Sequence, residues 1–320
     1  MEGYKLIASS SPHIRSDENV SKIMLDVLIA LIPAFIASIF YFGFNSIILV
    51  VASVLSAIIT EVACQKIMKK PITISDFSAA VTGVLLAFNL PPTTPIWIPV
   101  IGSAFAIAIG KQVFGGLGNN FINPALAGRA FLLACWPTLM TNFSAPVGID
   151  AIATATPLAI MKGTAETGAQ LPSIMEMLMG RIPGCLGETS ALLLILGGVY
   201  LIARKVISWR IPAAYIGTVA VIAFITEGSI NGMLYHLLAG GLMLGAFFMA
   251  TDYSSSPVTP RGKIIFGIGA GLLTMLIREL GGYPEGVSYS ILLMNVLAPL
   301  IDKYTSPKLF GGAKKWEMKL

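Results

Sequence analysis

The sequence predicts an all-α membrane protein that crosses the bilayer many times. Apolar residues make up 55% of its 320 residues and charged residues only 12%, and the mean hydropathy is +0.81. Soluble domains average about 25% charged residues, so the composition excludes a soluble fold. A helix of about 20 residues spans a bilayer, and the chain has room for about ten. The net charge of +5 is attributed to membrane topology, and no nucleic acid partner is expected.

Apolar segments mark the expected spans. Several are short, at about 15 residues against the roughly 20 that a span needs, or are interrupted by Pro and Gly. We expect one helix in each of ten segments, which are 23–42, 46–65, 76–90, 96–110, 120–136, 189–203, 211–227, 233–250, 263–280 and 287–302.

The basic residues predict the orientation. If the N-terminus is cytoplasmic, 17 of the 21 Lys and Arg residues, Lys111 among them, fall in cytoplasmic segments, as the positive-inside rule requires. The exceptions, in or beyond the outer half, are Arg129, Lys162, Arg181 and Arg278. Both termini are expected in the cytoplasm. The chain then divides into a cytoplasmic segment 1–22, a first membrane repeat 23–136, an extracytoplasmic loop 137–188, a second membrane repeat 189–302 and a cytoplasmic tail 303–320.

The two halves of the chain match at a constant offset. Ile59-Thr60-Glu61 recurs 166 residues later as Ile225-Thr226-Glu227, and Gly115-Gly116 recurs at the same offset as Gly281-Gly282. Each half carries half of the expected spans, and an odd number of spans inverts the second half relative to the first. We therefore expect about ten transmembrane helices in a 5+5 inverted repeat.

Inverted repeats place their sites where broken helices meet near the middle of the bilayer. The expected breaks are Asn89–Pro92 and Thr251–Ser254, where polar residues interrupt apolar segments. Non-helical backbone at that depth must be buried in protein or line a wet cavity. Ordinary loops at opposite surfaces are the alternative for both segments, and the sequence does not decide between the two.

Four segments carry a resemblance to one family of membrane subunits: Ser75–Gly83, Asn119–Arg129, Asp150–Pro157 and Phe248–Gly262. The last is long and specific. Along essentially its whole length the chain resembles the family that contains the D subunits of Rnf complexes and the B subunits of sodium-translocating NADH:quinone oxidoreductases. The short chain, without an extended N-terminal region, favours the Rnf D subunits.

The resemblance implies a ten-helix fold related to the urea transporters, in a bacterial or archaeal plasma membrane. It implies an electron-transfer subunit of an ion-translocating ferredoxin:NAD oxidoreductase complex, which is an enzyme as a complex and inactive as a single chain. The coupling ion is Na⁺ or H⁺. The implied partners are a flavin transferase and the other Rnf subunits, among them integral membrane subunits and a second subunit with covalent FMN.

The resemblance also implies FMN joined by a phosphoester to the hydroxyl of Thr156. The segment has what such an acceptor requires: an accessible hydroxyl, small neighbours, Asp150 upstream, and Pro157, which prevents a helix from continuing backward through the site. Thr156 is favoured because it follows Ala155 at the family position, and Thr154 is a competing acceptor. Taken alone, the segment fits an Asp/Thr/Pro turn better.

Arg129 is an expected intramembrane cation, which is costly and is usually functional or paired. We expect it to face the flavin, with Asn119 and Asn123 as further flavin contacts. The alternative is a contact between helices in which Arg129 binds Asn119 or Asn123. The resemblance leaves open a second, non-covalent flavin among the helices.

Four carboxylates lie nearest the expected breaks and are candidates for an ion path: Glu61, Asp76, Glu227 and Asp252. Asp252 is favoured because it lies within the second break. Carboxylates at helix ends are most often solvated, which is the alternative for each. No metal site is expected, because the cysteines and the two histidines, His13 and His236, show no ligand spacing.

A small-solute channel or transporter of the urea-transporter type is the alternative function. The fold, the repeat and the breaks fit it as well. The segment Asp150–Thr156 discriminates between the two functions, because a channel needs no flavin acceptor.

Overall fold

The computed structural model describes residues 19–144, 146, 155–163, 171–188, 190–282 and 285–307, and these contain helices and turns but no β-strand. Each of the expected apolar segments contains a helix. In chain order these are α1 (Val20–Phe42), α2 (Phe44–Ile67), α3 (Ser78–Phe88), α4 (Trp97–Ile107) with η2 (Ala108–Gln112), α5 (Pro124–Cys135), α9 (Ala191–Ala203), α10 (Arg210–Glu227), α11 (Ile230–Leu238) with α12 (Leu242–Leu244) and η4 (Gly245–Met249), α13 (Pro260–Leu280) and α14 (Val287–Thr305). The shorter elements are η1 (Ile74–Asp76), α6 (Pro137–Met140), α7 (Pro157–Met161), α8 (Ile174–Met179) and η3 (Leu186–Glu188).

Three helices, α1, α2 and α10, are long and apolar enough to cross a membrane on their own. A fourth span results if α11 and Leu242–Met249 count together, although they meet at a bend of 64°. Within the described ranges, the other helices do not meet both criteria of length and apolar character. The chain is therefore a membrane-spanning, all-helical protein in which several expected spans are short or interrupted.

Local sequence sets the ends of several helices. Asn123 caps α5 and Thr259 caps α13, each through a side-chain oxygen that accepts a backbone N–H of the first turn. Pro124 and Pro260 follow at the first helical position, where a missing N–H costs nothing. Ser190 caps α9 in the same way.

The first expected break is a buried interruption. α3 ends at Phe88, and the two prolines of Asn89–Pro92 follow, which lack the N–H that a helix needs. This segment is buried. The carbonyl of Leu90 accepts a hydrogen bond from the N–H of Leu186 in η3 at 3.0 Å, which satisfies the non-helical backbone inside the protein. The segment is therefore not an exposed loop, as the requirement for buried non-helical backbone predicts.

The second half is interrupted twice. Between α11 and α12, Gly240 has a φ of +69°, a left-handed conformation that glycine adopts without strain. The sequence did not predict this interruption. After η4 the chain continues through Thr251–Ser254, where Thr251 is buried and Tyr253 is exposed. The expected second break thus begins inside the protein and leads outward.

Glycines allow the helices to approach closely. α2 packs against α3 and α4, and α10 packs against α13. A Cβ at Gly83 in α3 would lie 2.7 Å from the Cα of Val54 in α2, and one at Gly267 in α13 would lie 2.8 Å from the carbonyl oxygen of Ile211 in α10. Small residues at such crossings are typical of membrane helices.

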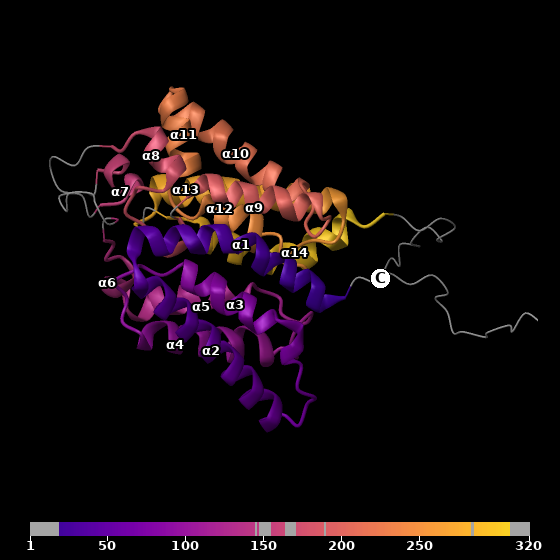
Figure 1. Cartoon of the computed structure of the whole chain (residues 1–320). Helices are drawn as coiled ribbons and strands as arrows, with labels where there is room; N and C mark the ends of the chain where they lie inside the picture. Colours follow the sequence, from indigo (N-terminus) through magenta and orange to yellow (C-terminus); the bar gives the residue numbers. More distant parts are fainter. Residues whose placement is uncertain are drawn as a thin grey trace, which may run out of the picture.

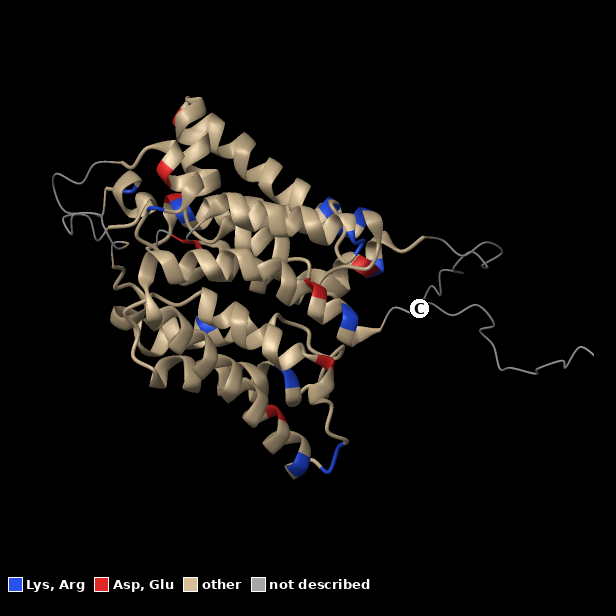
Figure 2. Cartoon of the chain, in the orientation of Figure 1, with Lys and Arg blue, Asp and Glu red and all other residues tan. Residues whose placement is uncertain are grey.

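The two ends of the bundle differ. In Figure 1, α6, α7 and α8 lie at one end, here called the loop end, and the chain enters α1 and leaves α14 at the other, here called the terminal end. Figure 2 shows most of the charged residues toward these two ends, with long uncharged stretches of helix between them. This distribution suits helices that cross an apolar layer.

Candidate functional site

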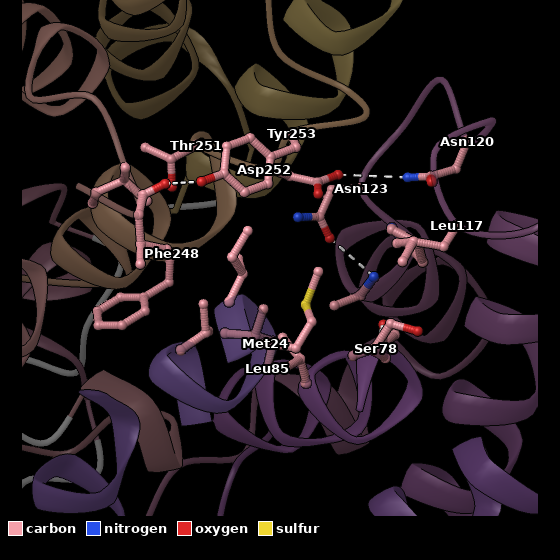
Figure 3. Close-up of a pocket in the computed structure, with 18 of the residues that line it drawn as sticks. Met24, Ser78, Leu85, Leu117, Asn120, Asn123, Phe248, Thr251, Asp252 and Tyr253 are labelled. Atoms are coloured by element: carbon pink, nitrogen blue, oxygen red, sulfur yellow. Dashed lines mark hydrogen bonds between the residues drawn. The ribbon is translucent and has the colours of Figure 1, made fainter. Parts of the chain in front are cut away.

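A cavity lies between the two halves of the chain, near the start of α1. It holds about 720 Å³ of space that protein atoms do not fill, its open mouth included. Figure 3 shows Asn120, Asn123 and Asp252 along one side, and Met24 and Leu85 opposite them. A polar wall that faces an apolar wall is typical of a ligand site.

Asn123 ties the two halves together at this cavity. Its Oδ1 accepts hydrogen bonds from the N–H groups of Ala125 (3.0 Å) and Leu126 (3.3 Å), and its Nδ2 donates to the carbonyl of Met249 at 3.2 Å. Its own N–H donates to Oδ1 of Asn295 at 3.2 Å. The side chain is therefore held in one orientation, with α5 fixed against η4.

Asp252 and Asn120 connect the halves a second time. Oδ2 of Asp252 accepts a hydrogen bond from Oγ of Ser255 at 2.8 Å and lies 3.5 Å from Nδ2 of Asn120. Oδ1 of Asn120 is buried, and it has no hydrogen-bond partner in the part of the chain that the structure describes. Buried acceptors without a partner are rare, so this oxygen is available to a donor in the cavity.

A buried ion pair stands beside the cavity. Nζ of Lys111 lies 2.6 Å from Oε1 of Glu61, and each residue is only 1% exposed. The same ammonium donates to Oγ of Ser78 at 2.6 Å. Gln112 (2.7 Å) and Gln65 (3.4 Å) also donate to Oε1 of Glu61. Because Lys111 and Ser78 line the cavity, the ion pair connects it to α2.

This placement removes the solvated alternative for Glu61 and corrects the expectation for Lys111. Glu61 is buried within α2 and is not solvated at a helix end, and Lys111 lies in the protein interior and not in a cytoplasmic loop. The cause is η2, a π-helical turn that continues α4 through Gln112; such turns are frequent at functional sites. Asp76 joins the same group, because Oγ of Ser78 donates to its Oδ1 at 2.6 Å.

Arg129 is buried at 6% exposure and forms an ion pair with Glu285. Its Nη1 donates to Oδ1 of Asn89 (2.5 Å) and to Oε1 of Glu285 (3.0 Å), and its Nη2 donates to the other oxygen of Glu285. Such two-pronged contacts are the strong form of the arginine–carboxylate pair. These partners replace Asn119 and Asn123, which the sequence suggested, and Asn119 is exposed.

Thr156 begins α7. Its backbone is extended, its side chain is half-buried, and its Oγ accepts a hydrogen bond from the N–H of Ala159 at 3.3 Å. Pro157 follows as the first helical residue, so the helix starts after Thr156 as the sequence predicts. Of the other residues of the segment, Ala155 is half-buried, and Asp150 and Thr154 lie outside the described residues.

α7 is fastened to the second half of the chain. Leu158 is buried, and a Cβ at Gly240 would lie only 2.8 Å from its Cδ1. Nζ of Lys162, just past the helix, donates to the carbonyl of Gly281. The position of Thr156 is therefore set by α11 and by the end of α13.

A second, polar cavity lies between α7 and the ends of α10, α11 and α13. Nε2 of His236 lies 3.4 Å from Oε1 of Glu227 and 3.9 Å from Oε1 of Glu279. Each of the three residues offers one potential ligand atom that lies within 4.8 Å of those of the other two. The sequence assigned His236 no metal role, whereas the structure groups three potential ligands here. Arg278, which donates to the carbonyl of His236 at 2.5 Å, also lines this cavity.

The candidate residues thus fall into separate places. Asn123, Asp252, Glu61 and Asp76 gather at the first cavity, directly or through Lys111 and Ser78, whereas Arg129, Thr156 and Glu227 lie elsewhere. The sequence did not single out Lys111 or Glu285. Lys111 directly follows the expected segment 96–110 and therefore resembled an interfacial lysine. Glu285 lies in a connection before α14 and gave no signal.

Comparisons with known proteins cover nearly the whole chain. The model of the family described as NQR2, RnfD, RnfE matches residues 7–311. The chain is 54% identical over 316 residues to the D subunit of the Na⁺-translocating ferredoxin:NAD⁺ oxidoreductase complex of Acetobacterium woodii, with 98% of both chains covered. It is 50% identical over 315 residues to the D subunit of the proton-translocating ferredoxin:NAD⁺ oxidoreductase complex of Clostridium ljungdahlii, with 95% of both covered. It is 36% identical over 346 positions to the D subunit of the ion-translocating oxidoreductase complex of Escherichia fergusonii, with 96% of this chain and 98% of the relative covered.

Proposed function

Because the chain belongs to the NQR2, RnfD, RnfE family, we propose that it is the D subunit of an ion-translocating ferredoxin:NAD⁺ oxidoreductase complex. The observation that carries this proposal is its identity of 54% and 50%, over nearly the full length of both chains, to two subunits with that name. The chain acts as an electron-carrying membrane subunit, and partner subunits supply the other carriers and the sites for ferredoxin and NAD. The two relatives are named for different ions, Na⁺ and H⁺.

Thr156 is the residue that we propose for covalent FMN. The product would be a phosphoester between its Oγ and the FMN phosphate, which adds the mass of FMN minus water to the chain. The half-buried hydroxyl at the start of α7, next to the small Ala155, supports this assignment. The long hydrogen bond from Ala159 is compatible with it, because an ester oxygen still accepts. The flavin supplies the redox chemistry when bound, and the protein supplies its position and electrostatics.

The cavity beside Lys111 is the place that we propose for a second, non-covalent flavin. Its apolar wall, with Met24 and Leu85, suits the face of an isoalloxazine ring, and its polar wall offers the unpartnered Oδ1 of Asn120 to a ring N–H. Asn123 remains a candidate contact because it lines this cavity. Arg129 lines a separate small cavity at the loop end, with Glu285 and Thr141, and is retained as a contact for the covalent flavin.

The inverted repeat is also proposed. The five helices of the first half begin 163 to 171 residues before counterparts in the second, in the pairs Val20 and Ala191, Phe44 and Arg210, Ser78 and Leu242, Trp97 and Pro260, and Pro124 and Val287. The packing repeats as well: α2 contacts α4 as α10 contacts α13, and α4 contacts α5 as α13 contacts α14. These observations support a 5+5 arrangement. In the proposed topology the terminal end faces the cytoplasm and Thr156 lies on the outer side.

A urea-transporter-like channel is the alternative proposal, since the cavity and the broken helices suit it. It does not account for the similarity to redox-complex subunits. The decisive experiment is in-gel flavin fluorescence and intact mass of the denatured chain, made with its flavin transferase. We expect the mass of FMN minus water, lost in Thr156→Val and retained in Thr154→Val. A wild-type chain without covalent flavin would refute the flavin assignment and favour the channel.

A further inference from the structure

The carboxylate of Glu61 is held unevenly. Its Oε1 receives all three donors, from Lys111, Gln112 and Gln65. Its Oε2 is buried and has no hydrogen-bond partner among the residues that the structure describes. Leaving one oxygen of a buried charged group without a partner is strongly unfavourable. This oxygen can therefore bind a cation or a proton.

The ammonium of Lys111 occupies this site as a bound cation would. It neutralises Glu61 in an interior where both residues are only 1% exposed. It contacts two oxygens, Oε1 of Glu61 and Oγ of Ser78, each at 2.6 Å. Unlike a free ion, it is attached to a flexible four-carbon stem, so it can leave the site but not the protein.

The cavity provides the second position for this ammonium. Lys111 lines the cavity from the first half of the chain, and Asp252 lines it from the second. The carboxylate of Asp252 is held in place by Oγ of Ser255, so the second half contributes a positioned carboxylate to the cavity that Lys111 lines. In the low dielectric of the interior, a further negative charge in the cavity attracts Lys111 strongly.

We propose that Lys111 is a tethered cation that fills an ion site at Glu61 and leaves it when negative charge enters the cavity. Glu61 then takes up one monovalent cation, H⁺ or Na⁺, through Oε2, and Oγ of Ser78 is released as a further oxygen ligand. Each electron that reaches the cavity from the reduced electron donor is balanced by one cation at Glu61. This inference rests on the proposed function, in which a redox group occupies the cavity.

The test uses the intact complex in proteoliposomes and a hydrophobic carbodiimide, which labels protonated carboxyl groups within membranes. Mass spectrometry of this chain reads the labelling of Glu61. We expect about tenfold more labelling of Glu61 after dithionite reduction than in the oxidised wild type, in sodium-free buffer. Lys111→Met should be labelled at the high level in both redox states. Lys111→Arg, which keeps the charge, should behave as the wild type, and Glu61→Gln gives the background.

Equal labelling of the oxidised and reduced wild type, or no gain in Lys111→Met, would overturn the proposal. Suppression of the labelling by Na⁺ identifies Na⁺ as the ion, and insensitivity to Na⁺ identifies H⁺. In Lys111→Met the number of ions taken up per electron transferred should also fall, and Lys111→Arg should restore it. A wild-type chain that lacks covalent flavin would contradict the proposed function but not this inference. The labelling of Glu61 in oxidised Lys111→Met tests the ion pair without any flavin.

Discussion

Asn89 and Met249 meet inside the protein: Nδ2 of Asn89 lies 3.7 Å from Sδ of Met249, 160 positions later in the chain. Asn89 follows the end of α3, and Met249 is the last residue of η4, so the ends of two interrupted helices from different halves touch. The same side chain donates to the carbonyl of Leu85 (2.6 Å) and accepts from Arg129 (2.5 Å). One amide therefore links both helix ends and the buried arginine.

Replacing this amide should destabilise the fold. In Asn89→Leu, Arg129 keeps its charge and loses a buried acceptor, and we expect the free energy of unfolding to fall by about 2 to 3 kcal/mol. Denaturant unfolding of the purified protein in detergent measures the change. Thr93→Val, at an exposed position four residues on, serves as the control. It removes a hydrogen bond to the carbonyl of Asn142 that water can replace, so stability should fall by no more than about 1 kcal/mol. An Asn89→Leu variant with unchanged stability would show that Arg129 does not depend on this contact.

The pair Arg129–Glu285 predicts a non-additive mutant series. Glu285→Ala leaves a buried guanidinium unpaired and should cost about 3 kcal/mol, the lower end for buried pairs because the Glu285 side chain is 19% exposed. Arg129→Leu combined with Glu285→Ala should recover part of this loss, because no unpaired charge remains. Unfolding midpoints of the two single variants and the double variant give the coupling energy. Strictly additive effects would contradict a direct pair.

The contact between α1 and α9 predicts a matched pair of glycine variants. A Cβ at Gly197 would lie 2.4 Å from the carbonyl oxygen of Ala30, whereas one at Gly217 would meet no atom within 4 Å. Gly197→Ala should therefore destabilise the protein by about 1 to 3 kcal/mol through overpacking. Gly217→Ala should be neutral or stabilise α10 by up to about 1 kcal/mol, since alanine favours the helix. Thermal unfolding of both variants tests this, and equal effects would disprove the close approach.

The capping box of α8 predicts acid-sensitive protection. The N–H and Oγ of Ser173 donate to Oε2 of Glu176 at 2.8 and 2.9 Å, and these bonds hold the pKa of that exposed carboxyl below its ordinary value. A lowered pKa in the folded state stabilises the helix above the pKa of the unfolded chain, and the effect is lost as the pH falls through the folded-state pKa. Protection of the α8 amides, corrected for intrinsic rates, should therefore fall in acid.

Hydrogen exchange read by mass spectrometry measures this protection. Ser173→Ala should lower it at neutral pH and weaken its dependence on acid, because only the bond from the backbone N–H of residue 173 to Glu176 remains. Ser229→Ala, which removes the cap of α11, is the control and should leave the pH dependence of α8 intact. An unchanged acid response in Ser173→Ala would show that the hydroxyl of Ser173 does not contribute to it.

The sequence predicted the features that depend on local chemistry. Every apolar segment contains a helix. Backbone N–H and C=O groups in an apolar layer have no water to bind, and a helix satisfies them within one segment. The break at Asn89–Pro92 was predictable from its prolines, and the start of α7 was predictable from Pro157. These features depend on residues that are neighbours in the chain, so they can be predicted from a single sequence.

The features that depend on distant partners were not predictable in this way. Lys111 ends an apolar segment and so resembles an interfacial lysine, and only the π-helical turn η2 and the position of α2 bury it against Glu61. Arg129 was recognised as unusual, but its partner Glu285 is 156 positions away. Such pairings follow from how the helices pack, and no local pattern encodes them.

The fastening of α7 has a mechanical consequence. Both of its anchors, Gly240 and Gly281, belong to the second half of the chain. If the two halves shift against each other, Thr156 travels with the second half, and so does any group esterified to it. The short helix α7 would then move with α11 and α13. A small rotation of these two helices would change the position of Thr156, and with it the neighbouring electron carrier that a group esterified to Thr156 can approach.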